Sequence, residues 1–145
     1  MTTMSNAKRI LLVEDEPGMA KVISKRLELA GFHVTLSTDG QDALVKARDG
    51  TPDLIILDLM LPKLNGYEIC TLLKQDRRYQ HIPIIMLTAK AQESDKKLGL
   101  ECGADAYLTK PYRADMLLDQ VWALLPSRPP APRTQGPSPA PPGTA

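Results

Sequence analysis

Residues 53–66 read DLIILDLMLPKLNG, and they contain the most apolar run of the chain, Asp53 to Leu57, followed at once by Asp58. An apolar run this short, without alternating polar positions, is typical of a strand covered on both faces. Comparable runs predict four more strands, of which the second is less apolar and is expected at a sheet edge: Arg9–Val13, Phe32–Ser37, Pro83–Leu87 and Ala106–Leu108. The chain is therefore expected to build a five-stranded sheet.

Amphipathic stretches follow these runs and predict five helices. Pro17 opens the first helix and Gly31 ends it, and the others span Gly40–Arg48, Gly66–Lys74, Ala91–Leu100 and Ala114–Leu125. The residues expected to face the core are Met19, Val22, Ile23, Leu27 and Ala30 in the first helix, Ala43, Leu44 and Ala47 in the second, Ile69, Cys70 and Leu73 in the third, and Ala114, Leu117, Leu118, Val121, Leu124 and Leu125 in the last. Alternation of strands and helices requires parallel strands with helical crossovers. The predicted fold class is α/β, a single doubly wound five-stranded parallel sheet with five helices on both faces.

Length and composition indicate one domain. We expect residues 1–6 to be disordered, residues 7–125 to fold, and the Pro-rich residues 126–145 to form a disordered tail or linker. A net charge of +1 argues against a dedicated nucleic-acid or membrane-surface binder. The sequence shows neither a signal peptide nor about 18 consecutive apolar residues, so a cytoplasmic location is expected. Cys70 and Cys102 are expected to be reduced, partly buried thiols.

Polar side chains follow the predicted strands at the point where each one ends. Glu14 and Asp15 follow the first strand, Asp58 the third, Thr88 the fourth, and Lys110 the fifth. In open parallel sheets these carboxyl ends share one edge, where ligands bind. Carboxylates about 4 Å apart repel by about 4 kcal/mol per pair at an effective dielectric constant of about 20. Such a cluster needs a cation, and Mg²⁺ suits hard oxygen ligands. A nucleophile, a metal, a hydroxyl and an ammonium together indicate phosphoryl transfer to a carboxylate.

Four stretches carry a resemblance to a known family: ILLVEDEP at 10–17, DLIILDLMLPKLNG at 53–66, IPIIMLTA at 82–89 and GADAYLTKP at 103–111. The sequence resembles the receiver domains of bacterial two-component response regulators, over roughly residues 8–125. The resemblance implies a flavodoxin-like sheet with strand order 2-1-3-4-5. Two positions depart from the commonest pattern, since Glu14 stands where many members have Asp and Tyr112 where Phe is commoner.

The resemblance also implies a role for each site residue. Asp58 would accept the phosphoryl group, and Glu14, Asp15, Asp58 and the backbone carbonyl of Met60 would ligate Mg²⁺. Thr88 would hydrogen-bond the phosphoryl group, Lys110 would pair with Asp58, and Tyr107 would turn inward as Thr88 shifts. The Lys110–Pro111 peptide bond would be cis.

Partners and output follow from the same resemblance. A sensor histidine kinase or a histidine phosphotransfer protein would donate the phosphoryl group. The surface of the fourth helix, fifth strand and fifth helix would then contact a downstream protein target, a missing output domain, or a second copy in a homodimer. Met60 and Lys90, two residues beyond Asp58 and Thr88, are unsuited to orienting a hydrolytic water, so slow autodephosphorylation is expected.

Three other interpretations compete with this one. A haloacid-dehalogenase-like phosphohydrolase would place its nucleophile after the first strand with a second Asp two residues on, where this chain has Met60. A pseudo-receiver that no longer takes phosphate would not need the full set of acidic, Thr and Lys residues. A flavin-binding domain would want a Ser/Thr/Gly-rich loop after the first strand, but residues 14–16 are acidic.

Overall fold

The computed structural model describes residues 7–59, 61, 64–88, 102–110 and 112–125. Within them five strands form one parallel sheet of order β2-β1-β3-β4-β5, as predicted. The strands are β1 (Arg9–Val13), β2 (His33–Ser37), β3 (Leu54–Asp58), β4 (Ile84–Thr88) and β5 (Ala106–Thr109). The helices are α1 (Pro17–Leu29), α2 (Gly40–Gly50), α3 (Gly66–Lys74) and α5 (Ala114–Leu124). The helix predicted at 91–100 lies outside the described residues.

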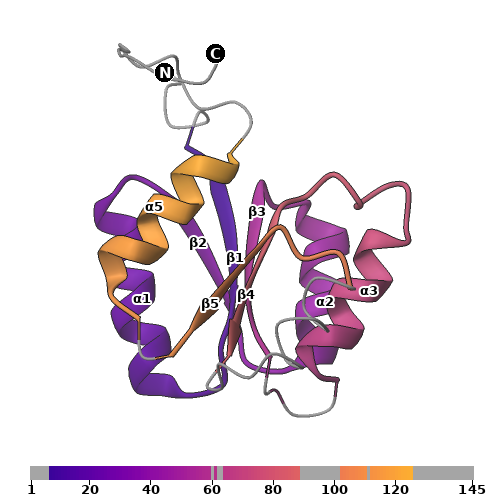
Figure 1. The fold of residues 1–145 in the computed structure, drawn as a ribbon, viewed down its shortest axis with the longest axis horizontal. Helices are drawn as coiled ribbons and strands as arrows, with labels where there is room; N and C mark the ends of the chain where they lie inside the picture. The colour runs from indigo at the N-terminus through magenta and orange to yellow at the C-terminus, as the bar shows by residue number, and fades with distance from the viewer. Residues whose placement is uncertain (1–6, 60, 62–63, 89–101, 111, 126–145) are drawn as a thin grey trace.

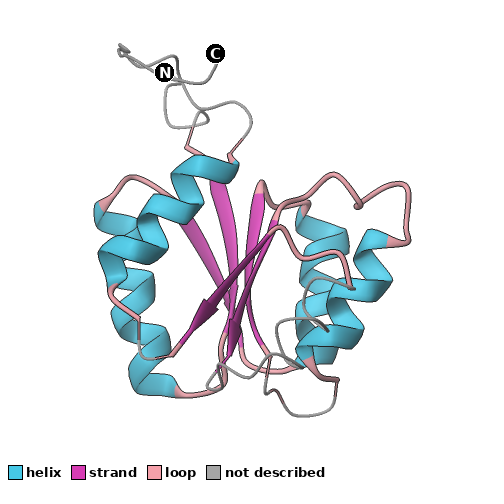
Figure 2. Cartoon of the chain, in the orientation of Figure 1, coloured by secondary structure: helices cyan, strands magenta, loops and turns pink. Residues whose placement is uncertain are grey.

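Two helical layers cover the sheet, α1 and α5 on one face and α2 and α3 on the other (Figures 1 and 2). Alternate residues of each central strand enter opposite layers. In β3, Ile55 and Leu57 pack with α2 and α3, whereas Leu54 and Ile56 pack with α1 and α5. Every residue of β3 and β4 is buried. Their sequences lack polar alternation because neither face of these strands meets water.

The helices α1, α2 and α3 begin after residues whose side chains cap them, whereas α5 has no side-chain cap. Asn65 and Glu68 form a capping box at the start of α3, and Asp39 accepts a hydrogen bond from the backbone N–H of Asp42 at the start of α2. Gly66, the first residue of α3, lies against the backbone of β3, where an added Cβ would stand 2.7 Å from the carbonyl oxygen of Asp58. The helix can therefore start this close to the sheet only because residue 66 has no side chain.

One helical face was predicted wrongly. Met19 and Val22 are 37% and 59% exposed, and the buried stripe of α1 consists of Ala20, Ile23 and Leu27. The apolar arc of α1 is wider than the strip that the sheet can cover, so the residues at its margin remain in contact with water. The inward positions predicted for α3 are all buried.

Candidate functional site

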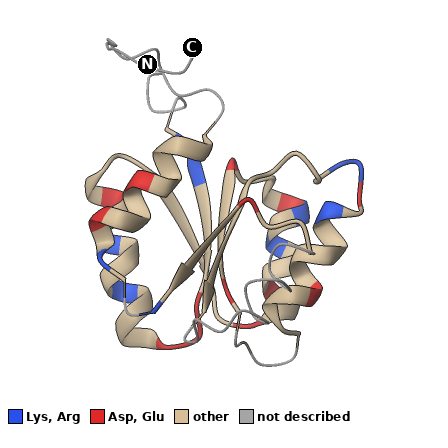
Figure 3. Cartoon of the chain, viewed as in Figure 1, with Lys and Arg blue, Asp and Glu red and all other residues tan. Residues whose placement is uncertain are grey.

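The ends of four neighbouring strands bring the candidate residues to one rim of the sheet. Val13 at the end of β1 is paired with Leu57 in β3, Asp58 with Leu87 in β4, and Thr88 with Thr109 in β5. Because the strands are parallel and end at nearly the same level, the residues at and just after these ends converge. Figure 3 shows acidic segments at this lower end of the strands.

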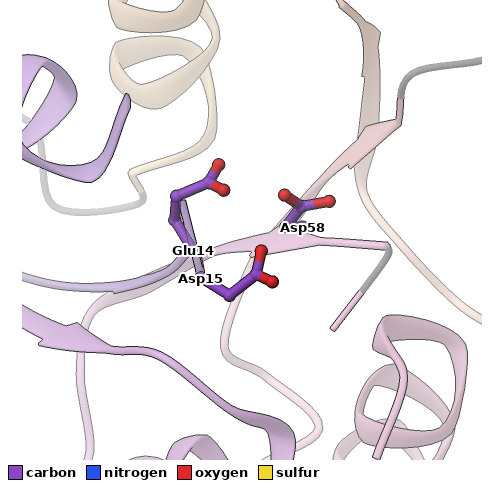
Figure 4. Close-up of side chains that lie close together, drawn as sticks. All are labelled: Glu14, Asp15 and Asp58. Atoms are coloured by element: carbon purple, nitrogen blue, oxygen red, sulfur yellow. The ribbon is translucent and has the colours of Figure 1, made fainter. Parts of the chain in front are cut away.

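Three carboxylates form the centre of this rim. Glu14, Asp15 and Asp58 each offer an oxygen, and these atoms all lie within 4.8 Å of one another. The three side chains point into a common space (Figure 4). Asp58 is the last residue of β3 and only 3% exposed, and Glu14 is 1% exposed, whereas Asp15 is open to solvent. The cluster thus has a buried floor and one exposed carboxylate at its mouth.

Local hydrogen bonds hold Glu14 in the rim. Its backbone N–H donates to the carbonyl of Ser37 at 3.0 Å, which continues the pairing of β1 with β2 by one residue. Its carboxylate oxygen Oε2 accepts from the backbone N–H of Glu16 at 3.1 Å. These bonds direct the other carboxylate oxygen, Oε1, toward Lys110.

Lys110 supplies the positive charge opposite the carboxylates. Its Nζ lies 2.8 Å from Oδ2 of Asp58 and 3.5 Å from Oε1 of Glu14. The backbone N–H of Lys110 donates to the carbonyl of Thr88, so the ends of β4 and β5 are tied together. Burial alone would lower the pKa of Lys110, but the hydrogen bond and charge of Asp58, with a smaller effect of Glu14, raise it above its ordinary value. The ammonium therefore stays charged.

One cation does not neutralise the cluster. Burial, followed by the negative charge of Asp58, raises the pKa of Glu14 to about 7, although Lys110 acts in the opposite direction. A buried carboxyl beside a second carboxylate is easier to protonate than a solvated one. The site therefore has an affinity for a further positive charge, which a proton or a metal ion can supply.

Three carboxylate oxygens in one open-mouthed cluster are the donor set of a hard divalent cation such as Mg²⁺, which prefers oxygen ligands and retains several waters. The exposed position of Asp15 leaves a route for solvent and ligand. Glu14, Asp15 and Asp58 are thus the described residues able to hold such an ion. Met60, predicted as a further ligand through its carbonyl, and Pro111, predicted to follow a cis bond, lie outside the described residues.

The two predicted switch residues lie on adjacent strands. Thr88 is the last residue of β4 and is buried. Tyr107 in β5 is paired with Met86 and packs, partly buried, against the cluster that contains α2 and α3. Both therefore lie near the rim, with Tyr107 two positions before Thr109, the residue paired with Thr88.

Tyr112 was not predicted as part of the site. Its hydroxyl is buried and has no hydrogen-bond partner among the described residues. Burial, followed by the charges of Glu14 and Asp58, raises the pKa of this phenol. The only signal in the sequence is an aromatic residue two positions after Lys110, which by itself does not show that its hydroxyl lies near the carboxylates.

Comparison with known protein families gives a match over most of the folded chain. The family model described as "Response regulator receiver domain" matches residues 10–122. The alkaline phosphatase synthesis transcriptional regulatory protein PhoP of Bacillus subtilis is 48% identical over 118 residues, which are 81% of this chain and 48% of that protein. The response regulator ArlR of Staphylococcus saprophyticus is 46% identical over 121 residues, 83% of this chain and 54% of that protein. The chain thus spans about half the length of these relatives.

Solved structures show the same similarity. The receiver domain of the sensor histidine kinase PA1611 from Pseudomonas aeruginosa, with a magnesium ion coordinated in its active-site cleft, has a TM-score of 0.77 and 35% identity, covering 83% of this chain and 99% of that one. The chemotaxis response regulator CheY4 of Vibrio cholerae has a TM-score of 0.78 and 31% identity, covering 83% and 100%. Among the described residues, no helix is long and apolar enough to cross a membrane.

Proposed function

The chain belongs to the response regulator receiver family, the phosphoacceptor domains of two-component signalling, and from this premise we propose that Asp58 is its phosphoacceptor and that Thr88 and Lys110 act with it. One observation carries the assignment. Asp58 is the only residue of the acidic cluster that is both at a strand end in the centre of the sheet and 2.8 Å from the Nζ of Lys110. Glu14 and Asp15 would then hold a metal ion together with Asp58.

The chemistry follows from this arrangement. A carboxylate oxygen of Asp58 attacks the phosphorus of a phosphohistidine or of a small phosphodonor, a P–O bond forms, and the bond to the departing group breaks. Lys110 stays charged and within reach, so it can transfer its hydrogen bond from Asp58 to a phosphoryl oxygen. Glu14, Asp15 and Asp58, with the Met60 carbonyl, would hold Mg²⁺, which when bound neutralises negative charge on the transferred group.

Phosphorylation would also change the surface of the domain. The product carries a charge near −2 and three strong hydrogen-bond acceptors. The Thr88 hydroxyl would move toward this group, and Tyr107 on the adjacent strand would fill the space it leaves. The changed surface would be that of β5, α5 and the helix predicted at 91–100. This surface would contact a protein target, an output domain or a second copy of the chain.

The proposal extends to partners and organisation. A sensor histidine kinase or a histidine phosphotransfer protein would supply the phosphoryl group. Residues 7–125 would be the receiver unit and residues 126–145 a linker. The stretch of this chain that matches a relative named as a transcriptional regulator is about half of that relative, and any contact with DNA would lie outside the receiver unit, because the charges of the chain nearly cancel. We place the domain in the cytoplasm and assign it no turnover beyond its own phosphorylation and slow dephosphorylation.

The test is labelling by acetyl phosphate in the presence of Mg²⁺. Asp58→Asn removes the nucleophile and is expected to abolish incorporation, whereas Asp119→Asn, the same change at an exposed position of α5, is expected to leave it intact. Strong residual labelling of Asp58→Asn would show another acceptor. In the same samples, release of phosphate is expected to take minutes or longer, and a half-life of seconds would contradict the predicted stability of the phosphoryl group.

A further inference from the structure

The two cysteines, 32 positions apart in the sequence, lie side by side in the fold. Cys70 is fully buried on α3, and its Sγ donates to the carbonyl of Cys102 at 3.4 Å. Cys102 lies in the turn before β5 and is partly exposed. In Figure 1 the chain that leads into β5 starts beside α3, which is how these two elements come together. The Cys70 thiol thus contacts the backbone of a partly exposed cysteine, which makes the two residues neighbours that a disulfide could join.

The environment gives the two thiols different reactivities. A hydrogen bond between the two side chains is the largest influence on both pKa values. Together with backbone hydrogen bonds and the charge of Lys74 it lowers the pKa of Cys102 to about 7, although burial opposes this. The same side-chain hydrogen bond, followed by burial, raises the pKa of Cys70 above its ordinary range. The thiolate is the reactive form of cysteine. Cys102 is therefore the nucleophile and Cys70 the buried partner.

A fixed cationic side chain holds the surrounding structure in place. The Nζ of Lys74 donates to the carbonyls of Gln80 and Ile82 at 3.1 and 2.8 Å and to the carboxylate of Asp105 at 2.9 Å. Asp105 also accepts from the backbone N–H of Ile84 at 2.9 Å. The end of α3 and the start of β5 are thus already held together, and the elements that carry the two cysteines are neighbours before any disulfide forms.

We propose that Cys102 and Cys70 form a redox site that a hydroperoxide converts to an intramolecular disulfide. The Cys102 thiolate attacks one oxygen of hydrogen peroxide, the O–O bond breaks, and the departing hydroxide takes a proton to become water. The resulting sulfenic acid is attacked by the sulfur of Cys70. The S–S bond forms, the S–O bond breaks, and the second hydroxide leaves with the Cys70 proton as water. The thiols lose two electrons and two protons, and the peroxide is reduced to two waters.

The disulfide would join α3 covalently to the turn that leads into β5. That turn contains Gly103, whose φ of +96° only glycine adopts without strain. Oxidation would restrain the turn and the strand that follows it, and reduction would release them. This inference concerns the thiols alone, so it stands or falls independently of the phosphorylation site.

The experiment treats the folded 145-residue chain with hydrogen peroxide, then alkylates the remaining thiols under denaturing conditions and measures the intact mass. The expected product has lost two hydrogens, takes up no alkylating agent, and returns to two alkylated thiols after dithiothreitol. A tryptic peptide linking Cys70 to Cys102 identifies the bond. Amide hydrogen exchange in residues 102–109 is expected to slow in the oxidised form.

Two variants separate the roles of the thiols. Cys70→Ser is expected to accumulate a sulfenic acid on Cys102 that dimedone traps, whereas Cys102→Ser is expected to leave Cys70 unmodified at the same peroxide dose. The proposal would be overturned if both thiols of the wild type could still be alkylated after a peroxide dose that oxidises a simple thiol such as glutathione. It would also be overturned if Cys70 were oxidised before Cys102. The wild-type measurement decides the question even where a variant folds poorly.

Discussion

Glu14→Gln is expected to stabilise the metal-free domain, and to do so in a pH-dependent way. The Glu14 carboxyl is almost completely buried beside Asp58, and its pKa rises from 4.5 to about 7 on folding. When folding raises the pKa of a carboxyl group, the free energy of unfolding falls as the pH rises from the pKa of the unfolded state to that of the folded state. Glutamine keeps the acceptor for the Glu16 backbone N–H and removes the charge.

The magnitude follows from the two pKa values. At about 1.4 kcal/mol per pH unit, the change from 4.5 to about 7 corresponds to roughly 3 kcal/mol once the pH is well above the folded pKa. The gain from Glu14→Gln is therefore about 3 kcal/mol near pH 8 and less than about 1 kcal/mol near pH 5, where the folded wild type is mostly protonated at this position.

Urea denaturation in EDTA at the two pH values measures this difference directly. Asp49→Asn on α2, an exposed residue away from the rim, is the matched control and is expected to change little at either pH. With excess Mg²⁺ the wild type should gain more stability than Glu14→Gln, because the ion neutralises the carboxylate that the variant lacks. The reasoning would be refuted if, in EDTA, Glu14→Gln raised the free energy of unfolding equally at pH 5 and pH 8, or did not raise it at pH 8.

Three further changes test the packing around the site by denaturation. Gly66→Ala places a methyl group 2.7 Å from the Asp58 carbonyl oxygen and should destabilise the fold by about 1–3 kcal/mol; wild-type stability would show that α3 can move away. Lys74→Met keeps the apolar stem but removes the ammonium that donates to two carbonyls and to Asp105, which would retain only its bond from the Ile84 N–H. This change should cost about 1.5–3 kcal/mol, and unchanged stability would contradict the structural role given to Lys74. Tyr112→Phe removes a buried hydroxyl without a partner in the described residues and should stabilise by about 1 kcal/mol, whereas a loss of stability would reveal an unseen partner.

The central strands could be predicted because a strand that is buried on both faces has a continuous run of apolar residues in its sequence. The run at Arg9–Val13 coincides with β1, and the runs before Asp58 and Thr88 mark β3 and β4 to within one residue. The small difference matters for the site, because Asp58 and Thr88 are the last buried residues of their strands and not the first residues of loops. The exposure of Met19 and Val22 in α1 was not predicted, because the hydrophobicity of a residue does not show whether the sheet extends far enough to cover it.

The convergence of the candidate residues at one rim could be predicted from the sequence, whereas most of their contacts could not. The rule that the carboxyl ends of parallel strands share an edge was sufficient to bring Glu14, Asp58 and Lys110 together. The burial of Glu14, and with it the raised pKa, depends on the path of the chain around β1 and could not be read from residue types. The contact between Cys70 and Cys102 likewise depends on how α3 packs beside the start of β5, since neither residue lies in a recognisable spacing.

Lys110 lies 52 positions after Asp58 and 96 positions after Glu14 in the chain, and its ammonium contacts both carboxylates. During synthesis Asp58 and Glu14 leave the ribosome well before the strand that positions their counter-charge. A nascent or C-terminally truncated chain would therefore carry Asp58 without the ammonium of Lys110. If Asp58 is the phosphoacceptor proposed above, such a chain would present an incomplete reaction centre until β5 has been made and has paired with β4.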